Sequence, residues 1–171
     1  MRDSALDSRS KIVKLVSLYP GIHLRELQRA VGVSFNSIRY NTEKLSRSGE
    51  IICEKTKGYS RLYPLGTSDQ DKVIYSLIQN KTTRRIIEEL TKEPLFTNKE
   101  LTEKTGFAKS TVSEHIHQLL SANLVRLTLS DQGNFKVELQ DREHIESLLG
   151  RARQFSLDND VVGNFADLWD F

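Results

Sequence analysis

The sequence of 171 residues has one cysteine, three prolines and no long apolar run. The single Cys53 has no second cysteine with which to form an intramolecular disulfide. No stretch approaches the roughly 20 apolar residues of a membrane-spanning helix, and the N-terminus MRDSALDSRS has no apolar signal-peptide core. We therefore expect an intracellular, cytoplasmic protein with no membrane partner.

Patterns of catalysis and metal binding are also missing. The chain has no Gly-rich phosphate loop and no Ser or Cys elbow. His115 and His117 lie two residues apart on a predicted helix, and side chains about 200° apart in direction cannot chelate one ion together. Cys53 could be a thiol sensor, but a lone cysteine on a strand is more often a small buried residue. We expect no enzyme, no metal and no cofactor.

Positive charge is concentrated at the start of the chain. Residues 1–66 hold 12 Lys and Arg against 6 Asp and Glu, a balance of +6, whereas residues 67–171 hold 13 against 17, a balance of −4. Such a distribution indicates that contact with a polyanion, if any, is made by the first part of the chain. Chance clustering is the alternative.

The segment 20–51, PGIHLRELQRAVGVSFNSIRYNTEKLSRSGEI, reads as a helix-turn-helix. Apolar residues at helical spacing precede Gly32, and Ser34 can cap a second helix that carries Ile38 on its inner side. An advance of about 100° per residue then turns polar and basic residues outward. Asparagine can pair with adenine and arginine with guanine, so this face suits a major groove. A solvated polar face is the alternative.

A hairpin is predicted after this helix, with strands at 51–55 and 61–65 and a turn at 56–58. A first helix is expected to begin at Ser8 or Ser10 and to end at Pro20. Together these elements form a winged helix over residues 8–66, in which the third helix enters the groove and the wing touches the flanking backbone. The candidate DNA contacts are Arg25, Asn36, Ser37, Arg39, Tyr40, Lys44, Arg47, Lys55, Lys57 and Arg61.

The sequence appears a second time at an offset of 74 residues. The shifted segments align without a gap and match at core, stop and turn positions: Ile12 with Ile86, Pro20 with Pro94, Leu27 with Leu101, Gly32 with Gly106, and Leu45 with Leu119. Two copies of one fold should match at these positions. The second winged helix is predicted at 81–140, with a linker helix at 67–80 and a helical tail at 141–171.

The second copy is expected to be a weaker reader of DNA. Its outward helix face places Glu114 where the first copy has Tyr40, and a carboxylate is repelled by phosphates. Its turn, near Asp131, lacks a counterpart of Lys57. The possible contacts of this second face are Lys109, Ser110, Thr111, Ser113, His117 and Gln118.

The tail carries an apolar stripe at near-helical spacing, formed by Val161, Val162, Phe165, Leu168 and Trp169. A helix of about eleven residues is marginal alone in water, so the stripe needs a surface to bury against. We predict a homodimer contact, since two symmetric half-sites are the common way to increase phosphate contacts. Packing on the protein's own core is the alternative.

Both copies resemble the winged-helix domains of archaeal transcription regulators, in the broad MarR-like and ArsR-like groups. The resemblance is carried by YPGIHLRELQRAVGVSFNSIRYNTEKLSRSGEI with its wing KTKGYSRLYPL, and by LFTNKELTEKTGFAKSTVSEHIHQLLSANLV. Family members usually have an apolar residue at the position of Thr42, where a threonine can bond a backbone carbonyl.

The resemblance implies a mainly α fold with small β-hairpins (α+β), built from two tandem winged helix-turn-helix domains. It also implies a sequence-specific regulator that binds double-stranded DNA and is associated with the nucleoid. A tandem winged-helix interaction subunit of a transcription or other assembly, with incidental DNA binding, is the alternative. The sequence names no small-molecule effector.

Overall fold

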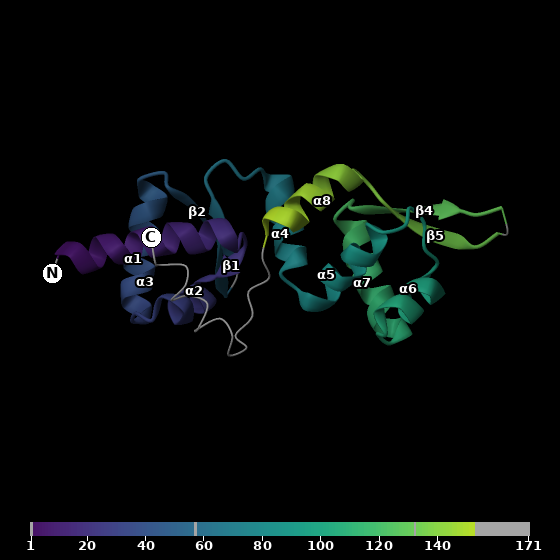
Figure 1. Cartoon of the computed structure of the whole chain (residues 1–171), viewed down its shortest axis with the longest axis horizontal. Helices are drawn as coiled ribbons and strands as arrows, with labels where there is room; N and C mark the ends of the chain where they lie inside the picture. Colours follow the sequence, from purple (N-terminus) through teal and green to yellow (C-terminus); the bar gives the residue numbers. More distant parts are fainter. Residues whose placement is uncertain (1, 57, 132, 153–171) are drawn as a thin grey trace. The chain divides into compact units, whose positions relative to one another are not determined.

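A computed structural model describes residues 2–56, 58–131 and 133–152 of the chain (Figure 1). The predicted wing residue Lys57 lies outside the described residues. So does the whole predicted dimerisation stripe, namely Val161, Val162, Phe165, Leu168 and Trp169. The described chain divides into two compact units: the first contains the residues up to Ser68 together with Ala152, and the second runs from Asp69 to Arg151.

The described part of the first unit has three helices and a small sheet. Its elements are α1 (Arg2–Leu18), β1 (Ile22–His23), α2 (Leu24–Val31), α3 (Phe35–Arg47), β2 (Ile51–Thr56) and β3 (Tyr59–Pro64). The sheet is antiparallel, in the order β1-β3-β2. Helix α1 begins at Arg2, so the predicted start at Ser8 or Ser10 is wrong. No glycine or proline interrupts the segment before Ser8, and a serine there does not oblige a helix to begin.

The apolar stripe of α1 packs on the helix-turn-helix and the sheet. The core cluster includes Ile12 and Val16 of α1, Leu27 of α2, Ile38 of α3 and Leu62 of β3, all buried. The spacing of apolar residues predicted the buried faces of these helices, because each helix has only one stripe to bury.

Local signals define the start of α3. The Ser34 hydroxyl accepts a hydrogen bond from the Ser37 backbone N–H at 3.2 Å, as expected for a cap. The buried Thr42 hydroxyl donates to the carbonyls of Ile38 (2.9 Å) and Arg39 (3.0 Å). A polar residue is therefore accommodated on the inner side of α3 without an unsatisfied group.

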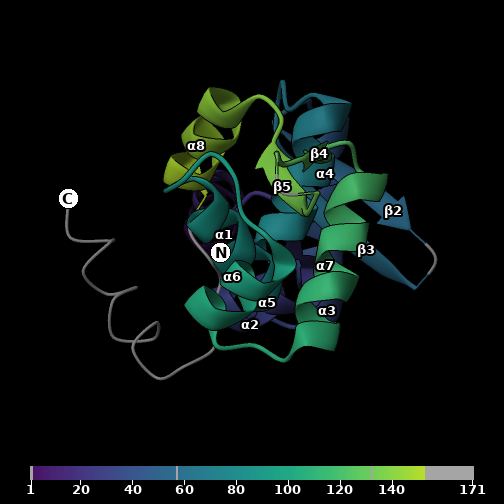
Figure 2. The ribbon, with the colours of Figure 1, turned by 90° about the vertical axis from the view of Figure 1, so that its right-hand side faces the viewer.

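The second unit contains four helices, a hairpin and a final helix. Its elements are α4 (Asp69–Ile78), α5 (Lys81–Leu90), α6 (Asn98–Thr105), α7 (Lys109–Ser121), β4 (Val125–Leu129), β5 (Phe135–Leu139) and α8 (Arg142–Arg151). Strands β4 and β5 are antiparallel, and Phe96 forms a bridge with Val137 of β5. Figure 2 shows this unit from the hairpin end.

Helices α4 and α8 belong to the second unit. Helix α4 falls in the predicted linker at 67–80, but it buries Ile74 and Ile78 and contacts both α5 and α8. His144 of α8 lies 2.7 Å from the Asp71 carboxylate of α4. No helix in the described chain combines the length and the apolar content needed to cross a membrane.

The two units share element bounds at the 74-residue offset. Helices α6 and α7 begin and end 74 residues after α2 and α3. Gly32 and Gly106 follow α2 and α6 with φ values of 75° and 73°, a left-handed conformation that favours glycine. The same offset relates two hydrogen bonds at the starts of these helices. Glu26 accepts from the backbone N–H of His23 at 2.9 Å, and Glu100 accepts from that of Thr97 at 2.7 Å.

A polar contact also recurs at this offset. Arg9 of α1 donates to the Asn41 side chain of α3, with 3.4 Å between Nε and Oδ1. Seventy-four residues later, Thr83 of α5 and His115 of α7 lie 2.9 Å apart, between Oγ1 and Nδ1. A side-chain hydrogen bond at the same pair of positions thus joins α1 to α3 in the first unit and α5 to α7 in the second.

Candidate nucleic-acid interface

The outer face of α3 presents cations and an aromatic ring to solvent. Arg39, Tyr40, Lys44 and Arg47 are all exposed, as is Asn36 at the start of the helix. The Lys44 ammonium lies 3.4 Å from the Tyr40 hydroxyl and 5.5 Å from the centroid of its ring. This is a cation–π contact between residues one turn apart on the helix.

Ser37 differs from its neighbours on this face. It is half-buried, and its carbonyl and hydroxyl both accept from the Asn41 amide, at 3.0 and 3.5 Å. The structure therefore engages Ser37 within the helix, on the side of α3 that approaches α1. Arg25 lies exposed on α2.

The hairpin adds a cation beside the end of α3. A hollow of about 280 Å³ is lined by Ser46 and Arg47 of α3 and by Cys53 and Lys55 of β2, together with Glu43. The Lys55 ammonium lies 3.7 Å from the Glu43 carboxylate. An ion pair this exposed contributes little, so Lys55 can exchange Glu43 for a phosphate oxygen and join Arg47 there.

Cys53 in this hollow is half-buried, and burial raises the pKa of its thiol. A thiol that stays protonated is a poor nucleophile, which agrees with the interpretation of Cys53 as a packing residue.

Arg61 has a different position from the other predicted contacts. It is half-buried, and its Nη1 donates to the Gly21 carbonyl at 2.7 Å. Arg61 pairs with Glu54 across the hairpin, so it lies on the face opposite to Lys55. Its guanidinium also lies 5.7 Å from the centroid of the Tyr59 ring. Arg61 thus links β3 to the turn before β1 and is separated from the basic face of α3.

Sequence reasoning missed Tyr59, an exposed aromatic residue at the outer end of β3. Its ring makes an edge contact with the His23 ring, with centroids 5.2 Å apart. Burial, followed by the positive charge of Arg61, lowers the pKa of His23 from its usual value of 6.5. The signal available was the Gly58-Tyr59 pair, which places an aromatic residue directly after a turn.

In the second unit, the corresponding helix face is nearly neutral. Lys109, Ser110, His117 and Gln118 of α7 are exposed beside Glu114. Thr111 and Ser113 are half-buried. Ser113 accepts a hydrogen bond of 2.7 Å from the Asn98 amide of α6, so its hydroxyl is engaged within the unit.

Helix α4 flanks this face of α7. An open hollow of about 730 Å³ lies between the two helices, lined by Gln70 and Val73 of α4 and by Glu114, Gln118 and Ser121, among others, of α7. A DNA backbone that approached α7 would meet the exposed Val73 and a carboxylate. Both features disfavour phosphate binding.

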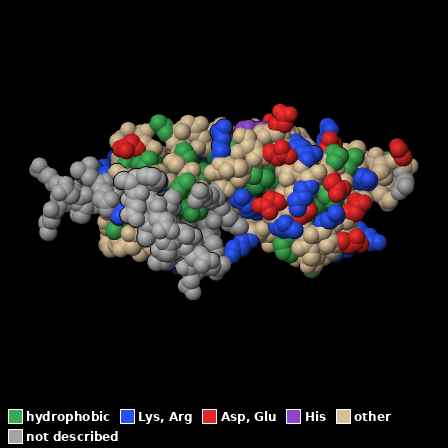
Figure 3. All heavy atoms as spheres, viewed as in Figure 1, with side chains coloured by type: hydrophobic (Ala, Val, Ile, Leu, Met, Phe, Trp, Pro, Cys, Tyr) green, Lys and Arg blue, Asp and Glu red, His purple; other side chains and the backbone are tan. Residues whose placement is uncertain are grey.

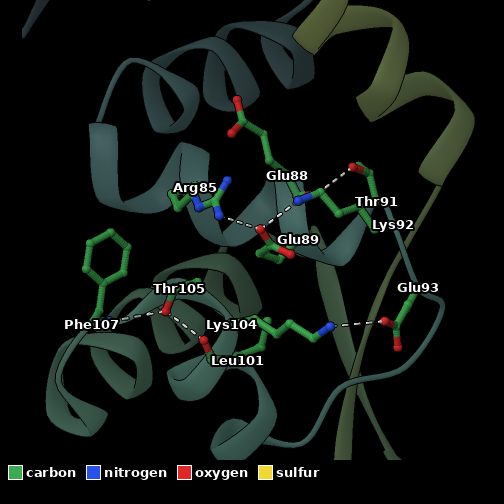
Figure 4. Close-up of polar contacts among 10 residues, drawn as sticks. All are labelled: Arg85, Glu88, Glu89, Thr91, Lys92, Glu93, Leu101, Lys104, Thr105 and Phe107. Atoms are coloured by element: carbon green, nitrogen blue, oxygen red, sulfur yellow. Dashed lines mark hydrogen bonds and ion pairs between the residues drawn. The ribbon is translucent and has the colours of Figure 1, made fainter.

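Several cations of the second unit are paired with carboxylates. Arg85 and Lys92 bind Glu89 at 2.8 and 2.7 Å, and Lys104 lies 3.8 Å from Glu93 (Figure 4). On the face drawn in Figure 3, Lys and Arg are interspersed with Asp and Glu over this unit. On this face the interspersed charges form no extended positive patch among the described residues, and an extended patch is what attracts a polyanion.

Comparison with known proteins identifies one part of the chain. Residues 71–126 match a protein family described as winged helix-turn-helix DNA-binding. No curated protein matches the chain.

Three solved structures are similar to the chain at low identity. A MarR family transcriptional regulator from Silicibacter pomeroyi is 18% identical, covers 58% of this chain and 75% of its own, and has a TM-score of 0.36. A chain of the endosomal complex ESCRT-II is 12% identical, with 84% and 66% covered and a TM-score of 0.35. A conserved hypothetical protein from Chlorobium tepidum is 12% identical, with 88% and 99% covered and a TM-score of 0.32.

At TM-scores this low, none of the three likenesses supports a conclusion. The family match does, and it spans α5, α6, α7 and most of α4. Residues 71–126 are therefore similar to a winged helix-turn-helix family described as DNA-binding, and the described chain is mainly helical with small antiparallel sheets.

Proposed function

We propose that the chain is a tandem winged-helix transcription regulator that binds double-stranded DNA in a sequence-specific manner through its first unit. The observation that carries this proposal is the set of exposed cations on α3, formed by Arg39, Lys44 and Arg47, with Lys55 of the hairpin beside Arg47. The corresponding positions of the second unit, Ser113, Gln118 and Ser121, carry no cation. On this proposal the protein acts in the cytoplasm, at the nucleoid, and is not an enzyme.

Residues at the two ends of helix α3 have different roles in DNA binding. Asn36 and Arg39 lie in its first turns, and side chains near the start of a recognition helix reach base edges. Lys44 and Arg47 lie in its last turn, next to the hairpin, where cations hold the phosphates on the flank of the groove. Tyr40 orients Lys44 through the ring contact described above. Sequence preference thus depends on the first two residues, and affinity on the last two and on Lys55.

The test is titration of a duplex at several salt concentrations with Arg39→Glu combined with Lys55→Glu. Loss of one base contact and one phosphate contact should weaken binding at least about 100-fold, relax the sequence preference and flatten the salt slope by about one. The matched control reverses Lys109 and Lys136 in the second unit, and should lose much less. Unchanged affinity of the first variant would refute the assignment, and an equal loss in the control would show that both units read DNA.

The alternative function is that of an interaction subunit, for which DNA binding is incidental. The observation in its favour is the balanced charge of the second unit, whose residues 69–151 hold 12 Lys and Arg against 13 Asp and Glu. Weak, salt-dependent binding without sequence preference would favour this alternative. We also infer that the regulator works as a homodimer, which doubles the number of basic faces.

A further inference from the structure

The second hairpin exposes an apolar face. Its directly opposed pairs are Val125 with Leu139, Leu127 with Val137, and Leu129 with Phe135. The pair nearest the helices is buried, but Leu127, Leu129 and Phe135 are 48%, 62% and 66% exposed. The hairpin projects beyond the helices of its own unit (Figure 1). Side chains alternate between the two faces of a strand, so the ion pair of Arg126 and Glu138 lies on the other face.

The fold does not require this apolar face. At the 74-residue offset, Leu127 corresponds to Cys53 and Leu129 to Lys55. The first hairpin thus has the same place occupied by a half-buried thiol and an exposed cation. Contiguous exposed apolar side chains are uncommon on monomers and mark contact sites. We call Leu127, Leu129 and Phe135 the apolar hairpin surface.

A hollow adjoins this surface. It has a volume of about 180 Å³ and lies between the hairpin and α7. It is lined by Ile116 and Leu120 of α7 and by Leu127, Phe135 and Val137 of the hairpin, with polar groups from Asn98, Ser113 and His117. One small region therefore offers both an exposed aromatic ring, that of Phe135, and an apolar hollow beside it.

We propose that the apolar hairpin surface is the interface with the same surface of a second copy of this chain. A two-fold interface needs one patch that is complementary to itself. The ring of Phe135 and the neighbouring hollow meet this need, since the ring of each copy can fill the hollow of the other.

Charge favours this occupant over a polyanion. Arg126 and Glu138 neutralise each other at 2.7 Å, and the second unit as a whole is close to neutral, so two copies do not repel each other. The place of the phosphate-binding Lys55 is taken by Leu129, which has no charge to offer DNA. The surface therefore suits a neutral apolar partner.

The size of the surface sets the expected strength. A phenylalanine covers about 150–250 Å², so a ring that is 66% exposed leaves roughly 100–160 Å² for contact. With the two leucines it forms the centre of an interface that needs about 800 Å² per partner in all. The polar remainder adds little affinity, so the association must be tested up to concentrations of about 100 μM.

The experiment measures the mass of the full chain by light scattering without DNA, from about 1 to 100 μM. Leu129→Lys copies the first hairpin and changes an exposed side chain, so the unit should still fold. The parent should be a dimer in this range, and the variant should dissociate at least about 100-fold more readily. The matched control, Thr128→Lys, changes the opposite face of the same strand and should leave the mass unchanged.

A parent that stays monomeric at about 100 μM, or a Leu129→Lys variant that dimerises as tightly as the parent, would overturn the proposal. Truncation after Arg153 tests the competing tail interface: a dimer lost by truncation but retained in Leu129→Lys would assign the interface to the tail. Mass is measured without DNA, so failure here leaves the proposed DNA binding to its own test.

Discussion

Glu89 is a carboxylate at a core position, and its replacement tests what holds the second unit together. Its side chain is only 5% exposed, whereas Arg85 and Lys92, which both bind its Oε1, are 45% and 56% exposed (Figure 4). At the 74-residue offset, the first unit has Leu15, which is buried in its apolar core. We predict that Glu89→Leu folds and is at least as stable as the parent.

The magnitude follows from opposing effects. Burying a leucine side chain contributes about 1.5–3 kcal/mol, and the desolvation cost of a buried charge disappears. Two charge-assisted hydrogen bonds, worth about 1.5–3 kcal/mol each in a dry site, are lost. Their loss is partly offset because the exposed Arg85 and Lys92 side chains are then hydrated. The free energy of unfolding should therefore rise by about 0–2 kcal/mol. In Glu89→Gln the acceptor of the two bonds loses its charge without an apolar gain, so a loss of about 1–2 kcal/mol is expected.

The assay is urea unfolding followed by circular dichroism, since urea, unlike guanidinium, does not screen charges. Glu88→Gln is the matched control, because Glu88 pairs with Arg84 at 2.9 Å but is 37% exposed. A surface pair of this kind is worth less than about 1 kcal/mol. A Glu89→Leu variant less stable than the parent by more than about 1 kcal/mol would refute the reasoning. It would show that the ion pairs stabilise the unit beyond what an apolar residue can supply.

Two further stability predictions concern the first unit. Thr42→Val should raise the free energy of unfolding by about 0.8 kcal/mol, the value of one buried methylene. The Thr42 hydroxyl bonds only the carbonyls of Ile38 and Arg39, which already accept helix hydrogen bonds, so its loss leaves no group unpaired. A lower urea midpoint would contradict this prediction. His23 has its pKa lowered by burial, so the unfolded chain binds the proton more tightly and stability is lost as the pH falls through 6.5. His23→Thr, which copies Thr97, should remove part of that loss between pH 8 and 5, and an unchanged pH dependence would count against it.

Sequence periodicity predicted the helices of both units because each helix buries one apolar stripe, and glycine marked their ends. Gly32 and Gly106 follow α2 and α6 in the left-handed conformation that glycine favours. The extent of α1 could not be predicted, because polar residues of ordinary helix propensity carry no start signal in 2–7. The placement of α4 in the second unit depends on its contacts with α5 and α8, and long-range packing leaves no local pattern.

In the candidate site too, contacts between distant segments could not be predicted from a local pattern. Counting residues from Ile38 placed Lys44 and Arg47 on the outer face of α3 and Arg39 on its flank, and the structure leaves all three exposed. Arg61 could not be assigned in this way, because the carbonyl that engages it belongs to Gly21, 40 residues earlier in the chain. A basic residue in a wing is therefore a DNA contact only if no part of the fold binds it first.

On the proposed function, the positions at which the two units differ indicate which unit binds DNA and which binds a second copy. A change in the core, from Leu15 to Glu89, is compensated within the unit by Arg85 and Lys92, so it alters stability and leaves the surface free. A change on the hairpin, from Lys55 to Leu129, has no such partner and alters what the surface can bind. Because a phosphate requires a cation and a protein partner requires apolar area, one substitution at this position can convert a DNA contact into a contact between copies. The proposal thus predicts that Lys55→Leu weakens DNA binding without loss of the dimer. Leu129→Lys should instead weaken the dimer and leave the DNA affinity of each single subunit unchanged.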